Sequence, residues 1–146
     1  MDIDRTAPVI TQDEIVIAAG LDTVWNLLTD IAAWPDWQHE IDRASLDTPL
    51  GVGAIFHWSM AGRAITSTVT DLIPHERIAW SGSVDGMVDI HVWRFMPVKD
   101  GGVRVQTEES WNGEPVRLDR ESMQRVLDQS IRSWLESLKR RAESQA

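Results

Sequence analysis

The chain of 146 residues contains no cysteine, no tyrosine and only two phenylalanines. Without cysteine it can form neither a disulfide nor a thiolate nucleophile nor a Cys-ligated metal site. No apolar run approaches the ~20 residues that a membrane-spanning helix needs. The first ten residues, MDIDRTAPVI, are acidic and lack the apolar core of a signal peptide. We therefore expect a cytoplasmic protein with no integral membrane segment.

Basic residues are also scarce, with 14 Lys and Arg against 23 Asp and Glu and a formal net charge of −9. Such a surface repels a phosphate backbone, so a nucleic-acid partner is not expected. The length suits one hydrophobic core. We expect a single domain over residues 1–146, with its core at about 10–142.

Motifs for metal, nucleotide or serine chemistry are missing as well. His39, His57 and His75 fall in peripheral positions, and no two histidines have the spacing of metal ligands. Residues 82–86, GSVDG, do not form a Gly-x-Ser-x-Gly elbow, and no glycine-rich phosphate loop is present. The sequence therefore predicts no metal and no cofactor.

Tryptophan, in contrast, is abundant, with eight residues. Trp combines the largest apolar side chain with an N–H that needs a partner. Two interpretations follow. The Trp side chains either fill a core, or several of them line a partly open pocket in which a flat ring stacks on a ligand.

A long amphipathic stretch ends the chain, between Pro115 and Ala142. Its spacing of three and four predicts a helix over about Asp119–Ala142, roughly 36 Å long. A helix of this length needs a broad apolar partner. Its apolar positions are Met123, Val126, Leu127, Ile131, Trp134, Leu135 and Leu138.

Short strands precede this helix. A first strand is expected at Ile10–Ala18 after a loose arm of residues 1–9, followed by a short helix capped by Asp22 and a turn or second short helix at 32–37. Tight turns then predict an antiparallel meander. Its strands are expected at Ile41–Leu46, Ala54–Met60, Ala64–Ile73, Arg77–Ser83, Met87–Met96 and Val103–Trp111.

Alternation along these strands assigns side chains to the face that packs on the long helix. The expected ligand-binding residues are Trp58, Met60, Trp80, Trp93, Thr107 and Trp111 on the sheet, and Met123, Leu127, Ser130 and Trp134 on the helix. Ser130 either bonds the carbonyl four residues back or leaves room for a ligand. Glu108 faces outward and is expected in water.

Two further pairs are candidates for function. His91 and Glu109 share the inner face of neighbouring strands, where an imidazole and a carboxyl can act as acid and base. The simpler alternatives are that they bond each other, or that Glu109 lies at the rim of the cavity in water. Trp34 and Trp37 flank Pro35 at the expected pocket mouth, or else fasten the short helices to the sheet.

Several stretches carry a resemblance to a known family: Val24-Trp25 with 27–30, Trp34–Trp37, Gly51–Gly53, Ile73-Pro74 with 77–80, Phe95–Pro97 with 101–105, and Glu108–Trp111. With them the chain resembles the START-like superfamily, also called SRPBCC or Bet v 1-like, and most closely its polyketide cyclase/dehydrase-type bacterial members. The resemblance covers about Ile10 to Ala142. It implies an α+β helix-grip fold, in which a curved antiparallel sheet of about seven strands wraps around a long C-terminal helix, with two short helices after the first strand.

The resemblance also implies a hydrophobic cavity, since members bind lipids, sterols, polyketides or plant hormones. Our first hypothesis is a carrier, sensor or scavenger of a small hydrophobic or aromatic ligand, lipid- or polyketide-like. The second is a cyclase or dehydratase acting on a polyketide-like carbonyl substrate through His91 and Glu109. The third is a cochaperone-like interaction module. The sequence leaves open whether the protein is an enzyme, and it is compatible with a monomer or a homodimer.

Overall fold

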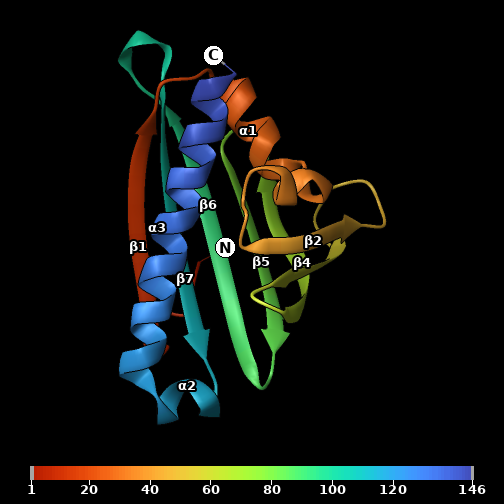
Figure 1. The fold of residues 1–146 in the computed structure, drawn as a ribbon, viewed down its shortest axis with the longest axis vertical. Helices are drawn as coiled ribbons and strands as arrows, with labels where there is room; N and C mark the ends of the chain where they lie inside the picture. The colour runs from red at the N-terminus through yellow and green to blue at the C-terminus, as the bar shows by residue number, and fades with distance from the viewer. Residues whose placement is uncertain (1, 146) are drawn as a thin grey trace.

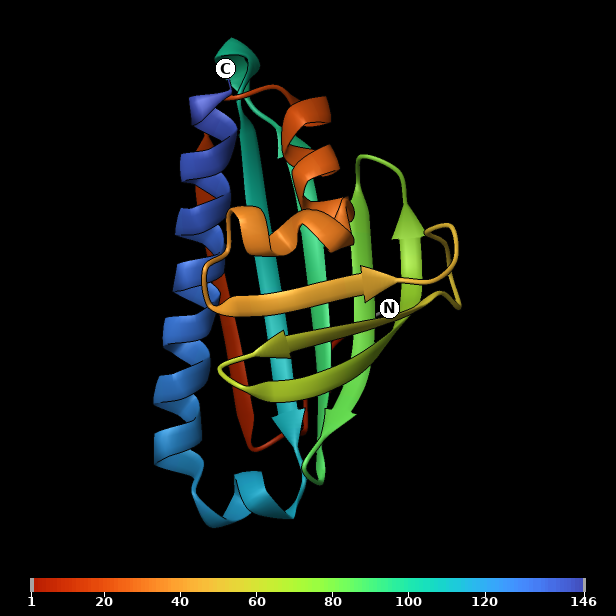
Figure 2. The ribbon, with the colours of Figure 1, turned by 45° about the vertical axis from the view of Figure 1, so that its right-hand side comes forward.

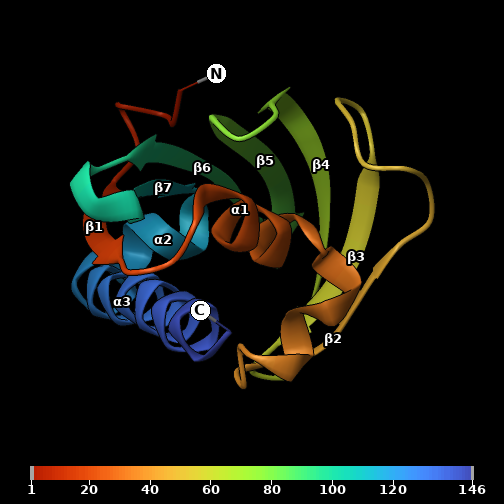
Figure 3. The ribbon, with the colours of Figure 1, turned by 90° about the horizontal axis from the view of Figure 1, so that it is seen from above.

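A computed structural model describes residues 2–145. Seven antiparallel strands form one sheet in the order β1-β7-β6-β5-β4-β3-β2, and the sheet curves around a long C-terminal helix (Figures 1 and 3). This arrangement confirms the predicted fold class. The strands are β1 (Val9–Ile17), β2 (Ile41–Leu46), β3 (Ile55–Met60), β4 (Arg63–Ile73), β5 (Arg77–Val84), β6 (Met87–Pro97) and β7 (Val103–Asn112).

The helices are α1 (Leu21–Thr29), the 3-10 turns η1 (Ile31–Asp36) and η2 (Lys99–Gly101), α2 (Glu114–Leu118) and α3 (Arg120–Ser144). A break at Asp119 (φ −144°, ψ 51°) separates α2 from α3. Within residues 2–145, none of these helices has the length and apolar character needed to cross a membrane.

One predicted cap is wrong. The N-cap of α1 is Gly20, and no side chain caps this helix end. The carboxylate of Asp22 instead lies 3.0 Å from His75 Nε2, in the turn between β4 and β5. This contact joins α1 to the sheet, because the imidazole of His75 also lies beside the ring of Trp25, with centroids 5.7 Å apart.

Strand alternation places the side chains on the two faces as predicted. Trp80, His91 and Glu109 are direct cross-strand neighbours on β5, β6 and β7, and all three are buried. His57, on the opposite face of β3, is exposed. The concave face of the sheet therefore carries large aromatic rings together with ionisable groups.

Six aromatic side chains, which we call the aromatic core, fill the centre between the sheet and α3. Trp34 of η1 lies 5.0 Å from Trp134 of α3 and 5.5 Å from Trp80 of β5, measured between ring centroids. Most of the contacts are edge-to-face or tilted, the arrangements that aromatic pairs prefer. The aromatic core consists of Trp34, Phe56, Trp58, Trp80, Trp93 and Trp134.

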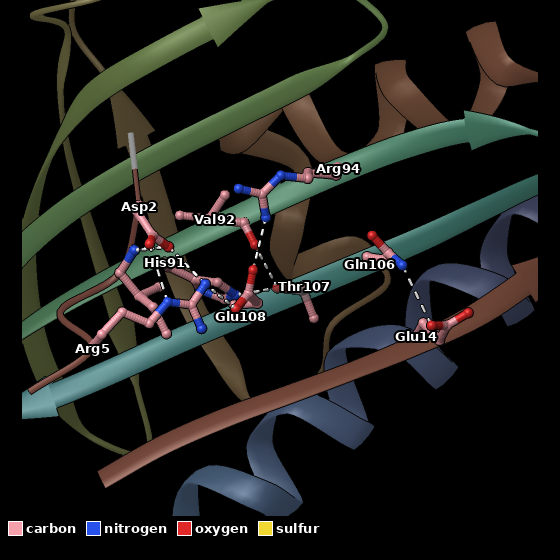
Figure 4. Close-up of polar contacts among 10 residues, drawn as sticks. Asp2, Arg5, Glu14, His91, Val92, Arg94, Gln106, Thr107 and Glu108 are labelled. Carbon is pink, nitrogen blue, oxygen red and sulfur yellow. Dashed lines mark hydrogen bonds and ion pairs between the residues drawn. The ribbon is translucent and has the colours of Figure 1, made fainter. Parts of the chain in front are cut away.

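Residues 2–8 of the N-terminal arm are packed against the sheet, contrary to the expectation of a loose segment. Ile3 is only 5% exposed and packs on Ala79 and Val92, on the convex face of the sheet. Arg5 reaches Glu108 at 2.7 Å, and Arg94 binds the other oxygen of this carboxylate at 2.8 Å (Figure 4). Glu108 is thus buried and paired rather than solvated, because the arm covers the strand on which it lies.

The arm should contribute to stability through Ile3. We expect Ile3→Ala to lower the free energy of unfolding by about 2 kcal/mol, because the substitution removes a buried apolar contact. Chemical denaturation measures this change. Val88→Ala is the matched control, since Val88 lies on the same convex face but is 51% exposed. Equal effects of the two substitutions would contradict the packing of the arm.

Candidate functional site

A pocket of about 540 Å³ lies between the N-terminal half of α3 and the ends of β3, β4, β5, β6 and β7. We call it the α3 pocket. Figure 2 shows the β3–β4 hairpin opposite this half of the helix. The apolar lining of the pocket consists of Met60, Ala61, Ile65, Val84, Met87, Trp111, Met123 and Val126. Its polar lining consists of Glu40, Arg63, Asp119, Ser122, Gln129 and Ser130.

The predicted ligand-binding residues fall into two groups. Met60, Trp111, Met123 and Ser130 line the α3 pocket. The others are buried outside its lining, because the aromatic core occupies the centre of the concave face. This second group comprises Trp58, Trp80, Trp93, Thr107, Leu127 and Trp134.

The tryptophans expected at the pocket mouth are placed in the interior. Trp34 is completely buried, and its Nε1–H donates to the carbonyl of Leu28 at 2.9 Å. Trp37 is 4% exposed and packs on Trp134, with centroids 5.9 Å apart. Neither residue belongs to the lining of the α3 pocket. They occupy the space that a deeper cavity would need.

The imidazole of His91 and the carboxyl of Glu109 lie against each other, with 3.2 Å between Nδ1 and Oε1. Thr107 fixes the imidazole from the other side. Its hydroxyl donates to the carbonyl of Val92 at 3.1 Å, so its oxygen accepts from His91 Nε2–H at 2.8 Å (Figure 4). The proton of the imidazole is then on Nε2. Nδ1 is left as an acceptor that faces the carboxyl.

Burial keeps both members of this pair neutral. Loss of hydration lowers the pKa of His91 to about 3. Burial also raises the pKa of Glu109 well above its usual range, and the nearby carboxyl of Asp89 raises it further, while the indole N–H of Trp111 acts against the rise. Glu109 and His91 therefore lie in contact as two uncharged groups rather than as an ion pair.

Asp89 is a third buried ionisable group, and the sequence interpretation missed it. It is 6% exposed and lies on the concave face, between Gly82 of β5 and Trp111 of β7. Burial raises its pKa to about 7, against the effect of nearby backbone N–H groups. Extending the alternation of β6 two residues back from His91 would have identified it.

Ser130 faces the α3 pocket, and within residues 2–145 its hydroxyl makes no hydrogen bond to a carbonyl of the preceding turn. Of the two alternatives, the structure therefore shows the small residue beside an open space. In the same described part of the chain, no three His, Asp or Glu side chains are grouped so that they could hold a metal ion.

The fold and the pocket define a helix-grip protein with a partly filled concave face. The sequence profile of a family described as polyketide cyclase/dehydrase and lipid transport matches residues 8–143. The chain therefore belongs to this family. No curated protein sequence matches it.

Solved structures support the fold. A hypothetical protein from Helicobacter pylori superposes with a TM-score of 0.84 at 18% identity, covering 96% of this chain and 91% of the other. A START superfamily protein from Mycobacterium smegmatis gives 0.82 at 13% identity, covering 94% and 99%. The Zhui aromatase/cyclase from Streptomyces sp. R1128 gives 0.80 at 17% identity, covering 92% and 93%. At these identities the similarity establishes the fold alone.

The raised pKa of Asp89 predicts a loss of stability with rising pH. Between pH 3.8 and about 7 the folded state keeps a proton that the unfolded state has lost, so the free energy of unfolding falls as pH rises through this range. Asn cannot ionise. We therefore expect the substitution Asp89→Asn to change the free energy of unfolding more favourably at pH 8 than at pH 5. The difference between the two effects should be on the order of 2 kcal/mol.

Urea denaturation at the two pH values measures this difference. Asp13→Asn is the control, because the carboxylate of Asp13 is part-exposed and paired with Arg132 at 3.1 Å. Its effect should be the same at both pH values. A pH-independent effect of Asp89→Asn would contradict the burial of an ionisable carboxyl at this position.

Proposed function

We propose that the protein binds a small hydrophobic or aromatic molecule, lipid- or polyketide-like, in the α3 pocket, as a carrier, sensor or scavenger. The observation that carries this proposal is the pocket itself. Its volume of about 540 Å³ is typical of small-molecule sites. Family membership supports the same class of ligand, because the family description includes lipid transport.

The lining suits an apolar ligand of variable shape. Met60, Met87 and Met123 contribute flexible thioether side chains, which adapt to different outlines and contact aromatic rings favourably. Trp111 adds an indole whose N–H is already bound to Glu109 at 2.8 Å. Its remaining surface is therefore apolar and suited to stacking or edge contacts.

The aromatic core limits how deep the ligand reaches. Leu127 and Trp134 are buried behind the pocket-lining part of α3, so the ligand contacts the first half of the helix and not its whole length. The rim carries polar groups, among them Arg63 and Asp119. A ligand with an apolar body inside and a polar group at the rim fits this distribution. An open pocket gives no support to the interaction-module hypothesis.

Filling the pocket should abolish binding. We expect Ser130→Phe to weaken the affinity for N-phenyl-1-naphthylamine, a neutral fluorescent probe, at least tenfold, because the new ring occupies the pocket. Fluorescence titration measures the dissociation constant. Arg140→Phe is the control, since this exposed residue lies nearly three turns further along α3. Unchanged affinity in Ser130→Phe, or no binding by the unmodified protein, would overturn the proposal.

A second candidate function is an enzyme acting on a polyketide-like carbonyl compound. The observation in its favour is the buried contact of His91 with Glu109, in which the carboxyl holds a proton and the imidazole a free electron pair. Glu109 lies two residues before Trp111 on β7, and Trp111 lines the pocket. For Glu109 to protonate a carbonyl, or His91 to remove a proton, the side chain of Trp111 must move aside.

Benzoylacetone provides a test of this second function. If the pair acts as acid and base, the protein accelerates deuterium exchange at the carbon between the two carbonyls, and NMR follows the exchange. His91→Ala and Glu109→Gln should each reduce the acceleration by about 100-fold, while the affinity for the ligand survives. Full exchange rates in both variants would exclude the pair as the acid and base.

A further inference from the structure

A chain of hydrogen bonds on the concave face of the sheet is incomplete. The indole N–H of Trp58 donates to Ser67 Oγ at 3.1 Å, and Ser67 is completely buried. Among residues 2–145, no acceptor takes the hydroxyl proton of Ser67. Across the neighbouring strand, Asp89 Oδ1 is buried and also lacks a hydrogen-bond partner in the described chain. An unpaired donor, the hydroxyl of Ser67, and an unpaired acceptor, Oδ1 of Asp89, thus lie on the two strands that flank β5.

Gly82 of β5 lies between these two groups. It pairs with Ser67 on one side and with Asp89 on the other. A Cβ atom built on Gly82 would lie 2.9 Å from Ser67 Oγ and 3.1 Å from Asp89 Oδ1. The Oγ of Ser67 and the Oδ1 of Asp89 therefore both lie close to Gly82, the one residue of these three cross-strand neighbours that has no side chain. The side chain of any other residue at position 82 would cover the two oxygens.

This convergence borders the α3 pocket. Along β6, the inward-facing residue before Asp89 is Met87, and the direct neighbour of Asp89 on β7 is Trp111. Met87 and Trp111 both line the pocket, as does Val84, the inward-facing residue that follows Gly82 on β5. The polar groups of Ser67 and Asp89 thus lie one inward-facing position deeper in the sheet than the apolar lining of the pocket. A ligand that displaces the flexible Met87 side chain reaches them.

We propose that Ser67 and Asp89 bind a hydroxyl group of the ligand, above Gly82, so that the α3 pocket selects apolar molecules that carry an alcohol or phenol. This inference rests on the proposed binding function and specifies its ligand class. The hydroxyl accepts from the hydroxyl of Ser67 and donates to Asp89 Oδ1. It completes a chain that runs from the indole of Trp58 to the carboxyl.

The chemistry of the two unpaired groups favours a hydroxyl over a carbonyl, an ether, an ammonium or a carboxylate. A carbonyl or an ether oxygen accepts from Ser67 but has no proton for Asp89. An ammonium group donates to Asp89 but cannot accept from Ser67. A carboxylate brings a negative charge against Asp89. Only a group that both accepts and donates satisfies both partners, and a buried unpaired donor or acceptor costs about 1–3 kcal/mol.

Two naphthalene probes that differ by one hydroxyl test the proposal. We expect 2-naphthol to bind at least tenfold more tightly than naphthalene, measured by competition with N-phenyl-1-naphthylamine. A third probe, 2-methoxynaphthalene, keeps the oxygen but has no proton to donate. It should bind no more tightly than naphthalene. Equal affinities of 2-naphthol and naphthalene would overturn the hydroxyl site, and a bound water would then account for the open groups.

Two substitutions on different strands locate the preference. Asp89→Ala removes the acceptor and Ser67→Ala the donor, and each should reduce the ratio of 2-naphthol to naphthalene affinity to near one while naphthalene still binds. Glu108→Gln is the matched control, since its buried carboxyl faces the convex side and is bound by Arg5 and Arg94. It should keep the ratio.

The outcomes separate this inference from the proposed function. If neither naphthalene nor 2-naphthol displaces the fluorescent probe, the binding function itself fails, and the hydroxyl site with it. If both bind and the tenfold preference survives in Asp89→Ala and in Ser67→Ala, binding stands but these residues do not select the hydroxyl. Circular dichroism of each variant verifies that it is folded, and a result from either folded variant decides the assignment.

Discussion

The packing of Trp34 against Trp134 is the contact on which the rest of the concave face depends. It joins η1 to α3 with ring centroids 5.0 Å apart, and the indole N–H of Trp34 is satisfied by the carbonyl of Leu28. Pro35 follows Trp34 inside η1, where its fixed φ restricts the conformations open to this turn. The indole of Trp34 thereby fills space between the sheet and α3.

The aromatic core divides α3 into two halves with different surroundings. The half that includes Trp134 and Leu138 packs as an ordinary hydrophobic core. The half that includes Met123 and Ser130 faces the open pocket. A long helix is therefore needed for two reasons: its second half stabilises the fold, while its first half forms the wall of a site that can remain empty without exposing the core.

Sequence patterns predicted the helices and strands well. They predicted less well which side chains fill the space between the sheet and α3. The period-two alternation placed His91 and Glu109 on the same face, and the tight turns predicted the meander, because both depend on local geometry. No local pattern shows how far the Trp34 indole reaches into the concave face. Nor does the alternation of β7 show that the N-terminal arm will cover Glu108, since this contact joins residues about 100 positions apart.

Glu108 and Glu109 illustrate how strongly the two faces of one strand differ. The first carboxylate is bound by two arginines on the convex face. The second lies on the concave face, where burial raises its pKa and keeps it protonated beside His91. With Asp89, the concave side holds two carboxyls and an imidazole without any arginine or lysine among their bonded partners in residues 2–145.

This arrangement is costly for a domain whose only task is to fold. Burying an acid without a cation disfavours its charged form, and apolar residues of similar volume would avoid the penalty. Asp89 makes the point most clearly, because one of its oxygens has no partner in the described chain. Destabilising polar groups beside a pocket are characteristic of functional sites, where stability is reduced in favour of recognition or catalysis. In our proposal, a ligand completes the hydrogen bonds of this face.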